Sequence, residues 1–142
     1  MLEALGPLMP WMHLMGRVLF SMIFIASGMN HLMKLDDMSA YAASKGVPAA
    51  KAATAISGLM MMFGGVTIVL GWSRFIGAGL LVLFLIPTAF MMHPFWKETD
   101  PQTSMNEMAH FMKTLALAGA AMLIAFYAAM PWPMINAPAG TL

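Results

Sequence analysis

The chain has 142 residues, of which 61% are apolar and only 9% charged, and its formal net charge is +1. Soluble domains carry about 25% charged residues, so this composition excludes an ordinary water-soluble globule and indicates a membrane protein of one domain. The absence of a basic cluster excludes a nucleic-acid-binding surface, and the absence of cysteine excludes a thiolate-held iron–sulfur cluster and covalent c-type haem.

Four apolar segments follow one another along the chain, at about 12–33, 52–70, 75–92 and 105–130. Each is close to the ~20 residues that a helix needs to cross ~30 Å of hydrocarbon. Helices are expected because lipid offers no hydrogen-bond partner to an open sheet edge. The sequence therefore predicts an all-α, polytopic four-helix membrane bundle, with residues 1–142 as a single transmembrane domain.

Local signals refine these segments. The short link at 71–74 predicts an antiparallel hairpin between the second and third helices. Thr103 or Ser104 is expected to cap the fourth helix, and Pro131 and Pro133 are expected to end it. The tryptophans fall at segment ends, as expected for side chains at the two bilayer interfaces: Trp11, Trp72, Trp96 and Trp132.

Small residues lie where helices are expected to pack closely. Thr54, Gly58 and Gly65 share one face of the second helix, and Gly119 with Ala120 lies midway along the fourth. We expect both groups to contact neighbouring helices, because small side chains let helix backbones approach in a membrane.

Counting the crossings brings distant polar residues together. Four crossings place both termini on one side and the loops at 34–51 and 93–106 on the other. The polar residues predicted to share the loop side are Asn30, His31, Asp36, Asp37, His93, Glu98, Glu107 and His110. A candidate site is therefore expected in this layer.

Within the fourth helix, Glu107 and His110 are three residues apart and share a face, while Lys113 lies about a third of a turn away and can reach the interface. In the first helix, Arg17 belongs to a polar stripe that should face the bundle, since lipid would penalise it by ~2.5 kcal/mol or more. Arg17 and His31 are ~21 Å apart along a helix, so Arg17 is expected to order the opposite end.

Three interpretations of His31, Glu107 and His110 remain open. They form an interfacial hydrogen-bonded network that fixes helix order, a site for a quinone head group or another small redox substrate, or a metal site. A histidine beside a carboxylate passes protons near neutral pH, as quinone chemistry requires. The metal interpretation is disfavoured, because a di-iron bundle needs a second Glu-x-x-His pair and further glutamates.

Several of these motifs resemble the DoxX family of four-helix integral membrane proteins. They are Arg17 with the following apolar run, Ser27-Gly28, the His-Leu-x-Lys exit at 31–34, HPFW at 93–96, and E-x-x-H-F-x-K-x-L-A-L-x-G at 107–119. The resemblance covers about 14–125, with Thr114 where the family most often has asparagine. It implies a bacterial inner (cytoplasmic) membrane protein and an association with membrane redox complexes. It also implies cytoplasmic termini, whereas the lysine excess at the loops favours cytoplasmic loops.

The residues and the resemblance together predict a membrane subunit of a quinone-linked oxidoreductase complex. The expected catalytic residues are His31, Glu107 and His110, and the expected quinone-binding residues are Arg17, His93, Phe95, Trp96 and Lys113. No metal site is predicted. The alternative is a non-catalytic subunit that anchors or assembles a larger membrane complex. A small-solute carrier is a third interpretation, which the lack of an inverted repeat disfavours. The expected partners are the lipid bilayer and other membrane subunits or further copies of the chain.

Overall fold

The computed structural model describes residues 8–126, and every regular element in this range is helical. In chain order the elements are α1 (Met9–Met33), α2 (Leu35–Ser44), α3 (Ala50–Leu70), α4 (Arg74–Met92), a 3-10 turn η2 (Phe95–Lys97) and α5 (Pro101–Phe126). Four helices, α1, α3, α4 and α5, are long and apolar enough to cross a membrane. The predicted all-α, polytopic membrane fold is confirmed.

The fourth membrane helix begins four residues earlier than predicted, at Pro101. Asp100 caps it: the backbone N–H and the hydroxyl of Thr103 donate to Asp100 Oδ2 at 2.8 and 2.7 Å, and the Ser104 N–H donates to the Asp100 carbonyl at 2.9 Å. Proline suits the first helical position because its missing N–H would have no partner there. The expectation that Thr103 or Ser104 is the cap is therefore wrong, and the expected end at Pro131 and Pro133 lies outside the described residues.

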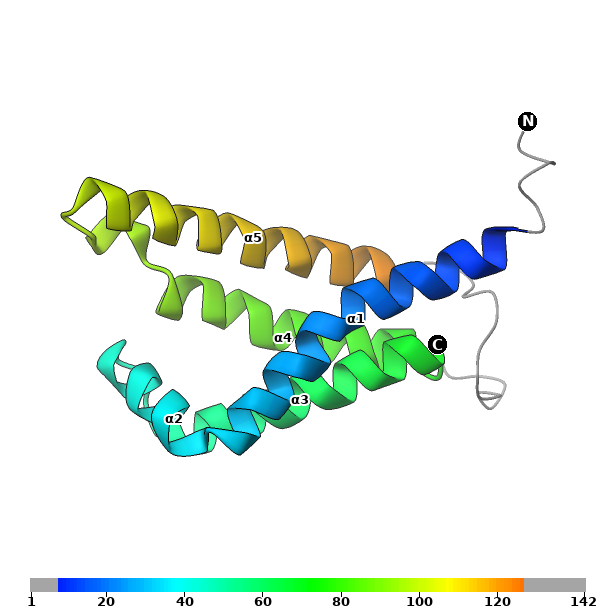
Figure 1. Cartoon of the computed structure of the whole chain (residues 1–142), viewed down its shortest axis with the longest axis horizontal. Coiled ribbons are helices and arrows are strands. Elements are labelled where there is room, and N and C mark those ends of the chain that lie inside the picture. The colour runs from blue at the N-terminus through cyan, green and yellow to red at the C-terminus, as the bar shows by residue number, and fades with distance from the viewer. Residues whose placement is uncertain (1–7, 127–142) are drawn as a thin grey trace.

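The short helix α2 is absent from the predicted elements. It follows α1 after Lys34 and has ten residues, too few to cross a bilayer. Asp36 and Asp37 lie in its first turn, where the helix dipole favours acids. Ser39 and Ala42 turn inward and are buried, so α2 lies against the loop-side end of the bundle (Figure 1).

The four long helices pack in the order α1, α3, α4, α5. Within the described chain, α3 packs against both α1 and α4, and α4 packs against α5, whereas α1 and α5 form no comparable interface. The last turns of α5 and the first half of α1 line one cavity, and Figure 1 shows α5 ending in front of α1. The inner helices α3 and α4 consequently bury 39% and 28% of their most apolar stretches, against 22% for α1 and 17% for α5.

Glycines lie where the packed helices come closest to one another. A Cβ atom placed on Gly28 of α1 would lie 2.6 Å from the Gly58 carbonyl oxygen of α3, and one on Gly64 would lie 2.9 Å from the Gly77 carbonyl oxygen of α4. Such distances are closer than real Cβ contacts allow, so the backbones themselves touch at these points.

The prediction for small residues is right for α3 and wrong for part of α5. Thr54, Gly58 and Gly65 are buried, as expected. Gly119 is exposed and has open space where a Cβ would lie, because the face of α5 that packs on α4 carries Ala118 and Ala121 instead.

The hydrophobic core lies between the four long helices; its buried side chains include Phe24, Met61, Ile68, Leu81, Leu85, Ala118 and Ala121. In α4 the helix continues through Pro87, and the next residue, Thr88, donates its hydroxyl to the Phe84 carbonyl at 2.7 Å.

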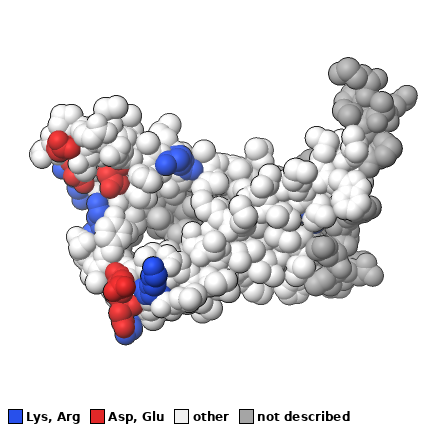
Figure 2. Space-filling view, in the orientation of Figure 1, with Lys and Arg blue, Asp and Glu red and all other residues white. Residues whose placement is uncertain are grey.

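Charged residues gather at the end of the molecule that carries α2 and the α4–α5 connection (Figure 2). All five acidic residues of the described range belong to this end: Asp36, Asp37, Glu98, Asp100 and Glu107. The predicted sharing of one side by the two loops is therefore confirmed. Trp11 and Trp72 are exposed at the opposite end and Trp96 at this one, while Trp132 lies outside the described residues.

Candidate functional site

A histidine–carboxylate pair joins the end of α4 to the second turn of α5. His93 directly follows α4, and its Nδ1 lies 2.7 Å from Oε2 of Glu107, with both side chains partly buried. The ring of His110, one turn further along α5, stacks on that of His93 with centroids 5.2 Å apart and planes 18° apart. An Nδ1–H that donates to the carboxylate fixes the His93 ring and leaves Nε2 for another partner.

Lys45 extends this network to α2. Its Nζ lies 3.7 Å from Oε1 of Glu107 and 3.9 Å from Oε1 of Glu98. These are ion-pair distances rather than hydrogen bonds. The lysine follows the last residue of α2, so it connects the α1–α2–α3 part of the chain to α5. The sequence predicts the correct membrane side for Lys45, that of the loops at 34–51 and 93–106. It predicts no partner for this lysine, because the partner depends on the fold of α2.

A cavity of about 440 Å³ lies beside this network, between α2, α3 and α4. Its walls are mainly apolar and include Met38, Tyr41, Met60, Phe84, Pro87 and Met91. Two histidines from different helices line it, His31 of α1 and His93. His31 Nδ1 lies 2.8 Å from the Ser27 carbonyl, so Nδ1 carries the proton of that hydrogen bond and Nε2 is the other ring nitrogen.

The predicted grouping of His31 with Glu107 and His110 is rearranged in the structure. Glu107 and His110 do lie together, but their direct partner is His93. His31 instead contacts Phe84, with ring centroids 6.5 Å apart. Its link to the network is that His31 and His93 line the same cavity. His93 is therefore the residue common to both features.

Phe95 and Trp96 belong to an aromatic cluster with Phe90 and Phe111, with ring centroids 5.1 to 6.3 Å apart. The Ser104 hydroxyl donates to the Phe95 carbonyl at 3.1 Å. These contacts fasten the α4–α5 connection to α5. Phe95 and Trp96 are not among the residues that line the cavity, and neither is Lys113, which is exposed on α5.

A more polar cavity of about 670 Å³ adjoins the first one at Met91. Ser44, Lys45, Lys97 and Glu98 contribute its polar walls. It lies between the end of α2 and the η2 turn, and Lys45, the ion-pair partner of Glu107, is one of its lining residues. Between residues 8 and 126, no three His, Asp or Glu side chains converge as metal ligands would.

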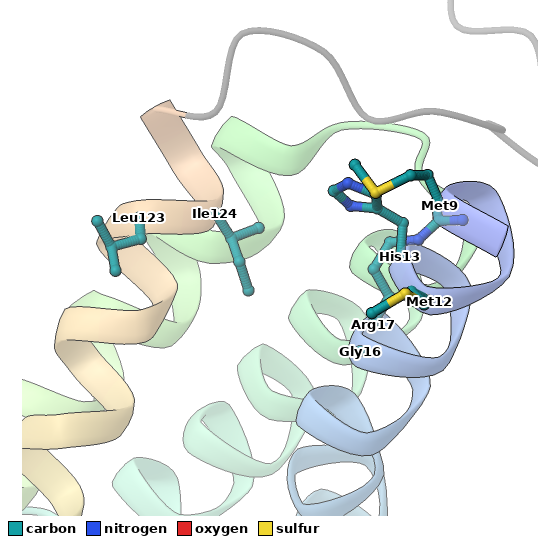
Figure 3. A pocket seen from close by; sticks show the side chains of 7 residues that line it. All are labelled: Met9, Met12, His13, Gly16, Arg17, Leu123 and Ile124. Carbon is teal, nitrogen blue, oxygen red and sulfur yellow. The ribbon is translucent and has the colours of Figure 1, made fainter. Parts of the chain in front are cut away.

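Arg17 lies apart from all of these residues. It is 5% exposed and, with His13, lines a separate cavity of about 440 Å³ between α1 and the last turns of α5 (Figure 3). The continuous helix α1 separates Arg17 from His31 by ~21 Å. The predicted location of Arg17 at the opposite end from the polar layer is confirmed.

The fold and this arrangement define a class: an integral membrane protein whose described part has four membrane-spanning helices, a cavity between α2, α3 and α4, and a polar network at one end of the bundle. Comparison with known proteins gives the family. The DoxX family model matches residues 12–94, and over 120 residues the chain is 32% identical to "Inner membrane protein YphA" of Escherichia coli (strain K12), covering 84% of this chain and 85% of that protein.

The chain belongs to the DoxX family and is a multi-pass protein of the bacterial inner membrane. The family model ends at residue 94, before the Glu107-x-x-His110 motif. No solved structure matches the chain.

Proposed function

We propose that the chain is the membrane subunit of a quinone-linked oxidoreductase complex, and that the cavity lined by His31 and His93 holds the quinone head group. One observation carries most of the support for the proposal: His31 of α1 and His93, which follows α4, both line one mainly apolar cavity, and His93 is hydrogen-bonded to a carboxylate. A volume of about 440 Å³ lies within the ~300–1,000 Å³ typical of small-molecule sites.

The ring nitrogens suit proton exchange with a quinone. Reducing a quinone to a hydroquinone adds two electrons and two protons, one proton to each oxygen. His31 and His93 each use Nδ1 in a hydrogen bond, to Ser27 and Glu107, so each has Nε2 for one quinone oxygen. Glu107 and Lys45 connect His93 to the polar cavity, from which it regains its proton. The electrons come from a partner subunit of the complex.

Quinone binding by the purified protein tests the proposal. Titration with a short-chain ubiquinone or menaquinone should saturate one site, and His31→Gln and His93→Gln should each raise the Kd roughly 10-fold, the loss of one hydrogen bond of ~1.4 kcal/mol. Asn106→Ala is the matched control, because Asn106 neighbours Glu107 in α5 but is exposed and hydrogen-bonds Gln102. Unchanged affinity in both histidine variants, or no binding to the wild type, contradicts the proposal.

The second candidate function is a non-catalytic subunit that anchors or assembles a larger membrane complex. The observation in its favour is the small buried fraction of α5, 17%, together with the open space beside Gly119 on a face that α4 does not cover. On this view Glu107→Gln lowers the amount of assembled complex, measured by copurification in mild detergent, and leaves the turnover of each assembled complex unchanged. Lower turnover at full assembly favours the quinone site.

A further inference from the structure

The short helix α2 faces α4 across two cavities rather than packing against it. Among the described residues, α2 packs against α3 and the end of α1 and forms no comparable interface with α4 or α5. Figure 1 shows α2 and the end of α4 lying apart. The cavity that His31 and His93 line lies between them, and its α2 side is formed by Met38, Tyr41, Ala42 and Val47. The polar cavity continues this gap between the end of α2 and the η2 turn.

The packing that holds α2 against the bundle is slight. Its two buried side chains, Ser39 and Ala42, are small, so little apolar surface leaves water when α2 docks. The Ser39 hydroxyl donates to the Asp36 carbonyl of the same helix at 3.0 Å and adds no bond to a neighbouring helix. A segment with few buried apolar contacts opens at a low cost in free energy.

Both ends of α2 have joints at which the helical geometry is interrupted. Lys34, between α1 and α2, has φ −114° and ψ 41°. Gly46, just after the helix, has φ 82°, in the left-handed region that glycine enters at little cost. The segment between these joints is attached to α1 and α3, whose backbones touch at Gly28 and Gly58. It can therefore pivot on a rigid base.

Lys45 joins this segment to the other side of the gap. Its Nζ lies 3.7 Å from Oε1 of Glu107 and 3.9 Å from Oε1 of Glu98. Within residues 8–126, these are the only ion pairs that cross from the α2 segment to the α4–α5 part of the chain. Both distances exceed that of a hydrogen bond, so the attraction is electrostatic. A lysine ammonium is a point charge on a flexible stem, which suits a contact that forms and breaks.

We propose that α2 is a lid over the cavity that His31 and His93 line, and that Lys45 holds the lid closed. While Lys45 contacts Glu107 and Glu98, the cavity is closed on the loop side. When the lysine leaves the two carboxylates, the segment at 34–49 pivots away from α4 and opens the cavity. The lid controls access whatever the cavity holds, and its role in admitting a quinone rests on the proposed function.

The reactivity of a thiol inside the cavity tests the lid without any quinone, so the result does not depend on whether quinone binds. The chain has no cysteine, and Thr54→Cys places a single thiol at a cavity position that is 4% exposed. A charged, water-soluble methanethiosulfonate should modify it slowly in the purified protein. Lys45→Gln should speed the modification ~5-fold, as expected for loss of a partly buried ion pair. Lys51→Gln removes an ion pair within the α2–α3 side and is the matched control, with an unchanged rate expected.

A second thiol position separates opening of the lid from unfolding. Ala121 is fully buried on α5 and does not line the cavity, so Ala121→Cys should stay unreactive when combined with Lys45→Gln. The proposal is overturned if Lys45→Gln speeds modification at both positions, since Lys45 would then hold the whole fold. It is also overturned if Lys45→Gln leaves the rate at Thr54→Cys unchanged.

A distance measurement in protein that keeps Lys45 covers the case in which Lys45→Gln does not fold. Spin labels at Ala43→Cys of α2 and Met105→Cys of α5, both exposed, report the position of the lid. Their separation should increase when salt is raised to about 1 M, because the Debye length falls to ~3 Å. Labels at Leu59→Cys of α3 and Met105→Cys are the control and should keep their separation. A lid distance that does not change with salt overturns the proposal.

Discussion

The helices of this protein are joined in two different ways. Along the apolar helices α1, α3 and α4, backbones touch at glycines, as at Gly28 with Gly58 and Gly64 with Gly77. At the loop-side end, helices are linked by long side chains, as Lys45 links α2 to α5. A backbone contact has no rotamer with which to relieve a clash, whereas a side-chain link can lengthen or rotate. The glycine contacts therefore determine how the helices pack. The side chains at the loop-side end can leave a protein partner and bind a ligand instead.

The largest effect is expected from Gly28→Leu. The new side chain meets the backbone of Gly58 and cannot be accommodated without moving α1, so overpacking should cost ~3 kcal/mol or more. Thermal unfolding in detergent and the monodisperse fraction after gel filtration measure the loss. Gly119→Leu is the control, because open space surrounds Gly119, and it should behave as the wild type. Equal stability of the two variants would contradict the conclusion that the glycine backbone contacts determine how the helices pack.

A smaller loss is expected from His93→Ala at the loop-side end. The variant removes the hydrogen bond to Glu107 and the stacking on His110, and the partly buried carboxylate keeps Lys45, so the cost should be ~1–2 kcal/mol. Thermal unfolding measures it. His110→Ala removes only the stacked ring from this pair and serves as the comparison, with a smaller change expected. A loss from His93→Ala as large as that from Gly28→Leu would show that the network holds the fold.

The cap of α5 should respond to pH. The hydrogen bonds from Thr103 lower the pKa of Asp100, so the stabilisation is complete above the ordinary aspartate pKa of about 3.9 and is lost as the pH falls through the lowered folded value. Hydrogen exchange of the first turn of α5 should accelerate in that acid range. Asp100→Ala should show fast exchange already at neutral pH, and Asp37→Ala, in α2, should not. Exchange independent of pH in the wild type would contradict the cap.

The smallest effect is expected from Lys51→Gln. The ion pair of Lys51 with Asp36 is short, 2.7 Å, but both side chains are exposed, and such pairs are screened by salt. Lys51 lowers the pKa of Asp36, so the variant should raise that pKa toward its ordinary value while leaving the unfolding temperature within error. NMR titration of the Asp36 carboxyl measures the first effect. A clear change in unfolding temperature at high salt would contradict this ranking.

Hydropathy and the counting of crossings predicted the four spans and the side on which the polar loops meet. They could not predict α2, because ten mixed residues carry no membrane signal and the helix depends on burying Ser39 and Ala42 against the bundle. They also grouped His31 with Glu107, whereas the connection after α4 brings His93 to that carboxylate. Counting gives the membrane side of a residue, but its partner depends on side-chain reach and on local turns.

Pro87 lies in the wall of the cavity between α2, α3 and α4. Because proline has no N–H, Pro87 cannot donate the regular helical hydrogen bond to the carbonyl of Leu83, and both residues line the cavity. Under the proposed function, a hydroquinone, which has hydroxyl donors, would compete for this carbonyl, whereas a quinone would not. Pro87→Ala would return the carbonyl to the helix and should weaken any such preference for the reduced form.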